Sequence, residues 1–202
     1  MTFIIVSKTD IYSLREYSKH LKNLPAEDKT SRFCYPAQDY VIDQLMLRIA
    51  YHYDEHHLWC ASVDEKNVGW GHLAYNEDGS MELAVSVDRD HQGKGIADRL
   101  MTEMLSWAKF HQISEIYMHC IEDNRVIQHL AAKHGLKTKE RQVGERTAAI
   151  ELPEPSFFEA NTQYWKEQAE IFSEFAPQLV FHSAALKHLA LLEVRYRNVL
   201  LM

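Results

Sequence analysis

Gly93, Lys94 and Gly95 are the residues of this sequence whose types and spacing most clearly suggest a chemistry. Residues 82–87, which precede them, are rich in apolar and β-branched types and predict a buried strand. A polar turn over residues 88–92 follows, and after Gly95 apolar residues recur with helical spacing up to residue 108. The first N–H groups of a helix lack internal partners, glycines let a ligand approach the main chain, and lysine adds a positive charge. The pattern therefore predicts a site that binds a phosphate group.

This glycine loop, residues 92–97, differs from two common phosphate-binding motifs. It lacks the Gly-Lys-Ser/Thr end of the P-loop, and Asp98 stands where the dinucleotide-binding pattern Gly-x-Gly-x-x-Gly needs its third glycine. It does match Gln-x-x-Gly-x-Ala at Gln92, Gly95 and Ala97, with a predicted strand in front. In this respect it resembles the coenzyme A pyrophosphate loop of the GNAT acyltransferase superfamily.

A second stretch extends the resemblance. Residues 115–121 predict a strand, Asn124 opens a helical pattern, and Gly135 followed by Leu136 ends it. This is similar to the next strand–helix unit of the family, so the resemblance covers residues 81–136. It implies the α/β (α+β) GNAT acyltransferase fold, a mixed twisted sheet flanked by helices, here with a pair of C-terminal helices added.

The same resemblance implies acetyl-CoA as the co-substrate. The pantetheine arm would enter between two strands and pair with the backbone of Val85 and Val87, and an N–H group around Val87 would face the thioester carbonyl. Asn124 would bond to the cofactor arm as well as cap its helix. The pyrophosphate would lie on the loop formed by Gln92, Gly93, Lys94, Gly95, Ile96 and Ala97.

Acyl transfer to an amine needs a base, because an alkylamine with a pKa of about 10.4 is mostly protonated at neutral pH. Glu82 stands at the strand position where several relatives carry a carboxylate base. A solvated residue at the start of the strand is the other interpretation of Glu82. Both interpretations stay open on the sequence.

The group that protonates the departing thiolate is harder to assign. Relatives commonly place a tyrosine four residues before the glycine that ends the downstream helix, and Ala131 occupies that position here. Tyr117 and His119, which share one strand face, are candidate substitutes, as are His129 and His134 on the helix. Each of them also has a structural interpretation, and a thiolate can leave unprotonated from a wet or positively charged site.

These patterns together predict an N-acyltransferase that moves an acetyl group from acetyl-CoA to a primary amine. A small molecule, a peptide N-terminus and a protein lysine all remain open as the acceptor. The alternative is a non-catalytic acyl-CoA-binding regulatory module with an intact loop and with Ala131 at the position of the acid. Measuring thiol release across a panel of amines, beside simple acetyl-CoA binding, separates the two.

Composition narrows the class of protein and its compartment. A net charge of −7 over 202 residues and a pI near 5.9 argue against a nucleic-acid binder and suit a cationic acceptor. Cys34, Cys60 and Cys120 lie far apart without a CxxC pair, which indicates reduced thiols in a cytoplasm. The apolar run over residues 3–6 is too short for a signal peptide or a membrane span.

The remaining parts of the first 153 residues predict framework elements. We expect a strand over residues 2–7, a helix up to residue 24, a hairpin from residues 58–63 and 68–75, and closing strands over 136–139 and 147–152. Residues 24–36 are expected to be an irregular loop in which Phe33 is buried and Arg32 solvated. Their Ser-Arg-Phe also resembles a segment of bacterial protein-lysine acetyltransferases with a GNAT domain. His52, His56 and His57 match no zinc spacing, so we expect a polar turn there and no metal site.

The C-terminal part extends beyond a minimal domain. Pro153 and Pro155 mark a break, so we expect a GNAT domain over residues 1–153 and a helical extension over 154–202. The first predicted helix carries an apolar, largely aromatic face from Phe157 to Phe175, and a second helix follows Pro177. So large an apolar surface packs on its own domain or on another subunit. We take the homodimer as the hypothesis to test.

Overall fold

The computed structural model describes residues 3–142, 145–156 and 159–169. The chain divides into two compact units, Met1–Pro155 and Ser156–Met202. The first unit contains the sheet and all of the candidate site residues.

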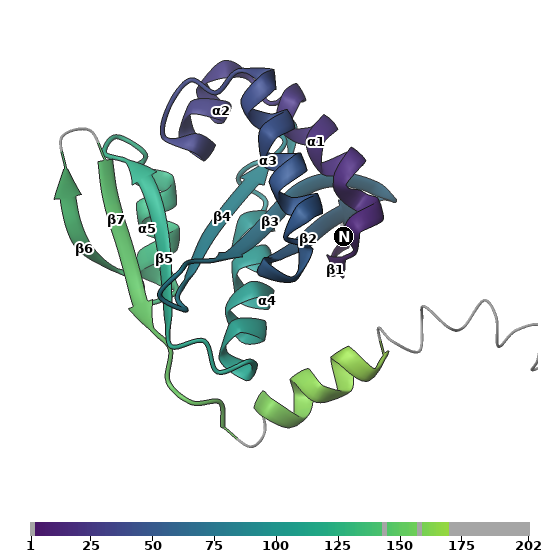
Figure 1. The fold of residues 1–202 in the computed structure, drawn as a ribbon, viewed down its shortest axis with the longest axis vertical. Coiled ribbons are helices and arrows are strands. Elements are labelled where there is room, and N and C mark those ends of the chain that lie inside the picture. The colour runs from purple at the N-terminus through teal and green to yellow at the C-terminus, as the bar shows by residue number, and fades with distance from the viewer. Residues whose placement is uncertain (1–2, 143–144, 157–158, 170–202) are drawn as a thin grey trace, which may run out of the picture. The chain divides into compact units, whose positions relative to one another are not determined.

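A sheet that has seven strands within the described residues forms the centre of the first unit (Figure 1). Its strands are β1 (Ile4–Thr9), β2 (His56–Val63), β3 (Lys66–Tyr75), β4 (Met81–Val87), β5 (Glu115–Ile121), β6 (Lys137–Gln142) and β7 (Glu145–Glu151). They lie in the order β1-β2-β3-β4-β5-β7-β6. Only β4 and β5 pair in parallel, and the other neighbours are antiparallel. The expected mixed sheet is therefore confirmed.

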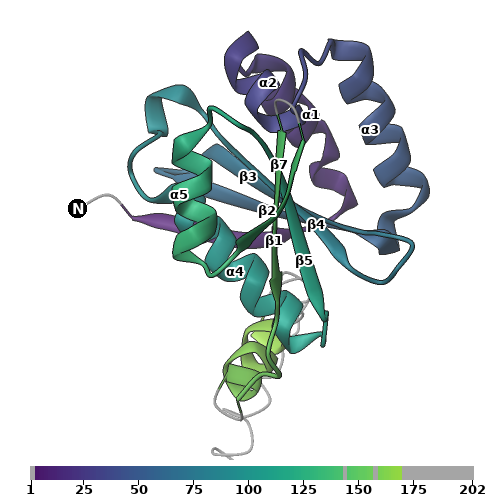
Figure 2. The same ribbon diagram turned by 90° about the vertical axis from the view of Figure 1, so that its left-hand side faces the viewer.

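Helices cover both faces of this sheet (Figures 1 and 2). On one face lie α1 (Leu14–Asn23), α2 (Ala26–Phe33) and α3 (Asp39–Tyr51), and on the other lie α4 (Ile96–Phe110) and α5 (Arg125–Lys133). Three short 3₁₀ turns, Ile11–Ser13, Tyr53–Glu55 and Arg89–His91, join these elements. The sheet is thus sandwiched between two helical layers, as α/β folds require for a sheet with two apolar faces.

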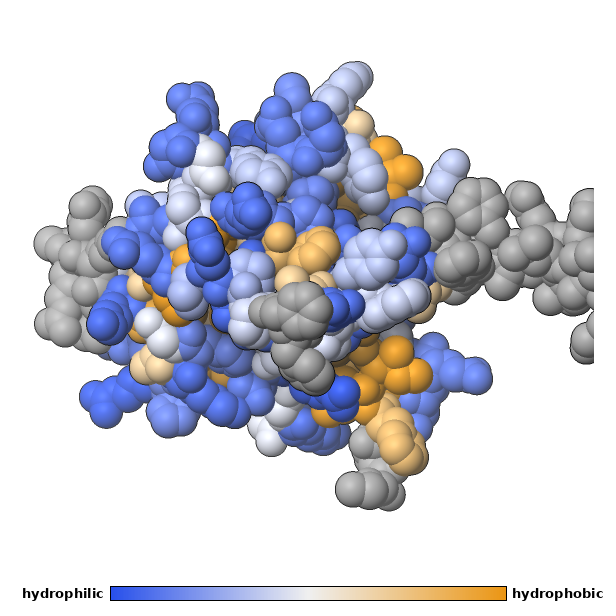
Figure 3. All heavy atoms as spheres, turned by 90° about the horizontal axis from the view of Figure 1, so that it is seen from below, coloured by the Kyte–Doolittle hydropathy of each residue, from blue (hydrophilic) through white to orange (hydrophobic). Residues whose placement is uncertain are grey.

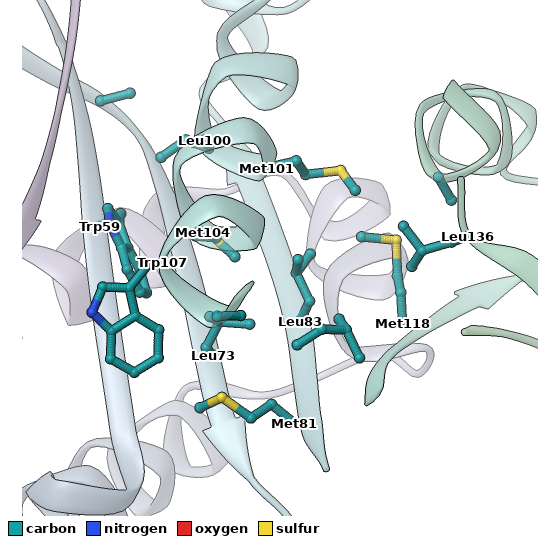
Figure 4. Packing of buried hydrophobic residues seen from close by; sticks show 14 of the residues in the cluster. Trp59, Leu73, Met81, Leu83, Leu100, Met101, Met104, Trp107, Met118 and Leu136 are labelled. Carbon is teal, nitrogen blue, oxygen red and sulfur yellow. The ribbon is translucent and has the colours of Figure 1, made fainter. Parts of the chain in front are cut away.

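The larger core lies between α4 and the sheet (Figure 4). Leu100 and Met104 of α4 and Leu73 of β3 have no exposed surface, and Leu83 of β4 is 1% exposed. These residues follow the periods of their elements, about 3.6 along α4 and 2 along each strand. Burying one such side chain contributes about 1.5–3 kcal/mol to stability, so α4 is held firmly behind the glycine loop.

A second core fixes α1 and α3 on the opposite face. Tyr17 and Leu21 of α1, Ile42 of α3 and Trp70 of β3 are all at most 1% exposed. The rings of Tyr17 and Trp70 lie 5.2 Å apart between centroids. This core sets the position of α1, from which His20 reaches β4.

The structure corrects the expectation of an irregular loop over residues 24–36. Residues Ala26–Phe33 form α2, which begins after Pro25 and ends at Cys34 with a left-handed φ of 62°. Two acidic residues in its first turn and Arg32 in its last turn suit the helix dipole. Arg32 is half-buried and Phe33 only partly buried, which differs from the expected solvated arginine.

The expectation of a polar turn at the histidines is also wrong in part. β2 begins at His56, so His56 and His57 are strand residues, and only His52 lies outside it. His56 is 6% exposed, and its Nδ1 lies 3.0 Å from Nε2 of His72 on β3. His57 packs on Trp107 with ring centroids 4.3 Å apart. Side chains from other elements bury these imidazoles, and the sequence around His56 and His57 does not indicate which side chains those are.

Strands β4 and β5 meet only at one end. Their parallel pairing consists of Met81 with Ile116 and Glu82 with Tyr117, after which the strands diverge. The β3–β4 ladder continues without a register shift to the pair of Gly69 and Val87. β4 therefore splays from β5 without a bulge, and its end nearest the glycine loop keeps a free edge.

In the second unit the structure describes a helix over residues 159–169. Ser156 and Glu159 exchange the hydrogen bonds of a capping box at its start. Tyr164 and Trp165 are 48% and 66% exposed. The second predicted helix and most of the predicted aromatic face, including Phe157, lie outside the described residues.

The surface has the mixed character of a globular protein. In the view of Figure 3, hydrophilic residues predominate and hydrophobic ones form small separate patches. Of the helices within the described ranges, none is long and apolar enough to cross a membrane.

Candidate functional site

A cleft of about 410 Å³ opens where β4 splays from β5. Its walls come from α2, the end of β4, the glycine loop, the start of α4 and the start of α5. The residues that line it are Leu24, Asp28, Ser31, Arg32, Val85, Ser86, Val87, His91, Gln92, Gly93, Gly95, Ile96, Ala97, Asp98, Asn124, Val126, Ile127, His129 and Leu130. The volume lies in the range of pockets that hold small ligands.

The glycine loop presents open backbone to this cleft. Gly93 and Gly95 have φ values of 72° and 80°, which side-chain-bearing residues rarely adopt. A Cβ built on either glycine would meet no heavy atom within 4 Å, so the space beside them is empty of protein. Gly95 is the N-cap of α4 and has no side chain to cap its N–H groups. The positive end of α4 is therefore available to an anion.

The other polar residues of the loop are engaged with the protein. The amide Nε2 of Gln92 donates to the carbonyl oxygen of Val87 at 3.1 Å and to Asp28 Oδ2 at 3.3 Å. Lys94 Nζ donates to the backbone oxygen of Asp90 at 2.8 Å, and Lys94 does not line the cleft. Gln92 thus organises the site, and its contact with a phosphate stays a prediction, as does that of Lys94.

Helix α2 is tied to the same loop by charge. Arg89 donates to Asp28 and to Glu27, each at 2.9 Å from Nη2. Arg89 also donates from Nε to the second oxygen of Asp28. Such partly exposed pairs contribute modestly to stability, but this two-point contact fixes the orientation of Arg89 relative to Asp28. The wall of the cleft formed by α2 is therefore held in register with the loop.

Asp98 places a carboxylate near the predicted phosphate position, and two side chains at the end of α5 bind it. Lys133 Nζ lies 2.8 Å from Asp98 Oδ2, and His134 Nε2 lies 2.9 Å from Oδ1. The hydrogen bond from Lys133, with a smaller contribution from His134, lowers the pKa of Asp98. His134 is therefore occupied structurally, whereas His129 of the same helix lines the cleft.

The free edge of β4 carries unpaired backbone groups. The N–H of Asp88 donates to Val68 of β3, and the carbonyl of Val87 accepts from Gln92 on the other side. Because backbone groups alternate in direction along a strand, the N–H groups of Val85 and Val87 point away from β3. They border the gap that the resemblance assigns to the pantetheine arm.

Asn124 has the predicted structural role. Its Oδ1 accepts from the N–H of Ile127 at 3.1 Å, so it caps α5. It also lines the cleft. Its bond to a cofactor stays a prediction.

The three predicted catalytic residues lie outside the lining of the cleft. Glu82 is half-buried and faces Tyr117 across the last β4–β5 pair. The hydroxyl of Tyr117 donates to Glu115 Oε2 at 2.6 Å, and exposed His119 lies 3.2 Å from Thr147 Oγ1. The structure thus brings Glu82 and Tyr117 together, away from the glycine loop, and their catalytic roles stay predictions. Ala131 is 2% exposed.

Three residues that meet near the carboxyl end of β4 were not identified from the sequence. Ser86 Oγ lies 2.9 Å from His20 Nε2, and His20 Nδ1 lies 3.0 Å from Asp88 Oδ1. Burial lowers the pKa of His20, Asp88 opposes this, and the charge of Arg32 lowers it further. His20 and Ser86 are 66 positions apart, so no local spacing could reveal the set.

Arg32, which the sequence analysis expected to be solvated, is half-buried at the same cleft. Its Nη2 donates to the hydroxyl of Tyr17 at 3.1 Å, while its Nε is buried and has no hydrogen-bond partner among the described residues. It lines the cleft close to His20. A positive charge therefore stands in the wall of the cleft that α2 forms. No group of three or more His, Cys, Asp or Glu side chains arranged for a metal ion occurs in the described part of the chain.

Comparison with known proteins relates this chain to a family and to solved structures. The sequence model described as the acetyltransferase (GNAT) family matches residues 19–136, which include the glycine loop and Asn124. A search of curated proteins found no match to this sequence.

Solved structures show the same fold. The GNAT domain of S. lividans PAT has a TM-score of 0.62 and 14% identity, covering 75% of this chain and 97% of that one. Spermidine N-acetyltransferase from Vibrio cholerae, in complex with CoA and spermine, has a TM-score of 0.61 and 18% identity, with 73% and 95% covered. PaiA N-acetyltransferase from Thermoplasma acidophilum, in complex with coenzyme A, has a TM-score of 0.59 and 16% identity, with 74% and 99% covered.

Proposed function

The chain belongs to the acetyltransferase (GNAT) family, and from that premise we propose that it moves an acetyl group from acetyl-CoA to a primary amine. One observation carries the proposal. The open left-handed glycine turn at the start of α4 and the free edge of β4 border the same cleft. An anion site beside an unpaired strand edge suits a ligand with both a pyrophosphate and an amide-bearing arm.

The cofactor fits the donors that the cleft supplies. The pyrophosphate lies on the backbone N–H groups of residues 93–97, where a Cβ built on Gly95 would meet no heavy atom within 4 Å. The pantetheine amides pair with Val85 and Val87, and Asn124 contacts the arm from α5. The CoA that accompanies two of the similar structures supports acetyl-CoA as the co-substrate.

The acyl transfer itself needs an oxyanion donor, a base and relief of the thiolate charge. The N–H of Val87 serves the developing oxyanion. Glu82 is proposed as the base that takes the amine proton through water. With Ala131 at the position of the family's tyrosine, Tyr117, His119 or the cleft residue His129 stabilises the thiolate.

The acceptor is a small-molecule amine, a peptide N-terminus or a protein lysine. The likeness to a spermidine N-acetyltransferase places polyamines first in a panel, and the net charge of −7 favours a cation. We also propose a GNAT domain over residues 1–153, a helical extension over 154–202 that joins two chains, and a cytoplasmic location in keeping with three free cysteines.

Ala131 favours one alternative, a non-catalytic acyl-CoA-binding module. An alanine with 2% exposure offers no proton to a thiolate. The module would bind acetyl-CoA and leave every amine unmodified.

The deciding experiment compares binding with turnover. Acetyl-CoA binding is measured by calorimetry, and CoA release is followed with a thiol reagent across polyamines, amino acids, peptides with free N-termini and lysine peptides. We expect binding and amine-dependent release for one class. Binding without release from any amine would support the module, and absence of binding would refute both functions.

A further inference from the structure

Three side chains near the carboxyl end of β4 are joined by short polar contacts, and one of them reaches the cleft. Ser86 Oγ lies 2.9 Å from His20 Nε2, and His20 Nδ1 lies 3.0 Å from Asp88 Oδ1. They come from three places, β4 for Ser86, α1 for His20 and the turn after β4 for Asp88. A hydroxyl, an imidazole and a carboxylate in this order are the parts of a nucleophile activated by an oriented base.

The chemistry of the three groups determines which atom donates and which accepts in each contact. A carboxylate only accepts, so the Nδ1–H of His20 donates to Asp88. A neutral imidazole then has a bare Nε2, which accepts the hydroxyl proton of Ser86. The side chain of His20 is 5% exposed and that of Asp88 is 41% exposed, so the imidazole is sheltered while the carboxylate is partly exposed to water. Burial lowers the pKa of His20, Asp88 opposes this, and the charge of Arg32 lowers the pKa further, so the resting imidazole is neutral and its Nε2 carries no proton.

Ser86 is also in the place where a thioester would arrive. It lines the cleft between Val85 and Val87, the two residues proposed to pair with the pantetheine arm. The N–H of the next residue, Val87, points into the gap and suits an oxyanion formed beside Ser86. Arg32, whose charge acts on His20, lines the same cleft. If these three side chains served only to hold α1 on the sheet, they would not need to lie at the cleft or beside the free edge of β4.

We propose that Ser86, His20 and Asp88 are a catalytic triad that takes the acetyl group from acetyl-CoA as an ester on Ser86 and, without an amine, passes it to water. The inference rests on the proposed function, because it uses the same bound thioester. It adds a second activity, hydrolysis of acetyl-CoA to acetate and CoA.

The steps balance without another reactant. Ser86 Oγ attacks the thioester carbonyl while its proton passes to His20 Nε2. The tetrahedral intermediate expels the CoA sulfur, which takes the proton from Nε2, leaving acetyl-Ser86 and the CoA thiol. Water then attacks the ester and gives a proton to Nε2. Collapse of the second intermediate releases acetic acid, and the proton on Nε2 returns to Ser86.

The test uses the full chain with acetyl-CoA and no amine. CoA release should show a burst of about one equivalent per site, and peptide mapping should find the acetyl group on Ser86, as an ester that hydroxylamine removes. Ser86→Ala should abolish the ester, and His20→Gln should slow CoA release by about 10²–10⁴-fold. Ser86→Cys keeps a nucleophile and should carry the acetyl group at position 86.

Matched controls separate chemistry from folding. Ser106→Ala and His52→Gln, on residues outside the cleft, should release CoA as the unsubstituted chain does. Every variant is checked for its circular dichroism spectrum and its acetyl-CoA affinity, which should stay unchanged for Ser86→Ala. The rate should fall on acidification as His20, which faces Asp88 and Arg32, becomes protonated, and His20→Gln should remove that dependence.

The outcomes distinguish this inference from the proposed function. Acetyl transfer to an amine with no ester at position 86, or a Ser86→Ala variant that releases CoA without an amine as fast as the parent, overturns the triad and leaves the proposed function standing. Absence of acetyl-CoA binding by the parent chain overturns the proposed function itself. An acetyl group found only on Cys34, Cys60 or Cys120 also counts against the triad.

Discussion

Replacing Gly95 with aspartate tests the proposed phosphate site, and the structure lets the expected loss be worked out. A Cβ at Gly95 meets no heavy atom within 4 Å, so the substitution causes no clash inside the protein. The φ of 80° costs a side-chain-bearing residue about 1 kcal/mol, which a folded domain tolerates. The new carboxylate enters the space proposed for the pyrophosphate. Two like charges about 5 Å apart at an effective dielectric of about 20 repel by about 3 kcal/mol, a loss of roughly 10²-fold in affinity.

Calorimetry with CoA measures this loss, and Gly79 offers a matched control. Gly79 has a φ of 82° and equally open surroundings, but it lies in the turn before β4 and does not line the cleft. Gly79→Asp should therefore carry the same backbone strain and bind CoA as the parent chain does. Gly95→Asn keeps the shape without the charge and should lose much less affinity than Gly95→Asp.

Two results would refute the reasoning. Parental CoA affinity in Gly95→Asp would mean that the pyrophosphate lies elsewhere. Equal losses in Gly95→Asp and Gly79→Asp would show that strain in the fold, and not charge at the cleft, governs binding.

Three further predictions address the base, acid stability and assembly. Glu82→Gln should lower kcat by about 10²–10⁴-fold with acetyl-CoA affinity unchanged, and a change within about threefold would move the base elsewhere. Burial lowers the pKa of His57 to about 4, so the unfolded chain binds a proton that the folded one refuses between about pH 6.5 and 4. Urea titrations should show the unfolding free energy decreasing by about 1–2 kcal/mol as the pH falls from about 6.5 to 4. His57→Gln should reduce this dependence on pH, and an unfolding free energy that does not change with pH would contradict this cause. Light scattering should show a homodimer that Tyr164→Ser with Trp165→Ser weakens, whereas a monomer at micromolar concentration would end the proposal.

The parts of the fold that the sequence predicted are those with local causes. Strand β5 falls at Glu115–Ile121 as expected, and Asn124 caps α5 through an N–H three residues away. The loop between Gln92 and Ala97 is also local, since its glycines fix the turn whatever packs around them. These elements could be located without knowing any long-range contact.

Helix α2 and the buried histidines depend on distant partners. Only eight residues long and with Phe33 as its large apolar side chain, α2 carries too short a pattern to be recognised. Arg89 holds it from 61 positions away. His56 becomes a core residue only because His72 on the next strand meets its ring.

The candidate site divides in the same way. The glycine loop follows from adjacent residues, whereas the pairing of His20 with Ser86 exists only after α1 has packed across the sheet. Glu82 was selected by its position in the family pattern, and the structure places it at the closed end of the splay. The family pattern therefore selected a strand that borders the cleft, whereas contacts from other elements determine which residues line the cleft.

The short junction between β4 and β5 makes the sheet behave as two plates. One plate holds β1–β4 and the other holds β5–β7, and the two residue pairs at Met81 and Glu82 are the hinge between them. A cofactor that lies along Val85 and reaches Asn124 wedges between the plates and sets the angle at which they stand. We expect the acceptor to enter beside the same wedge, in which case each ligand alters the affinity for the other by the same factor.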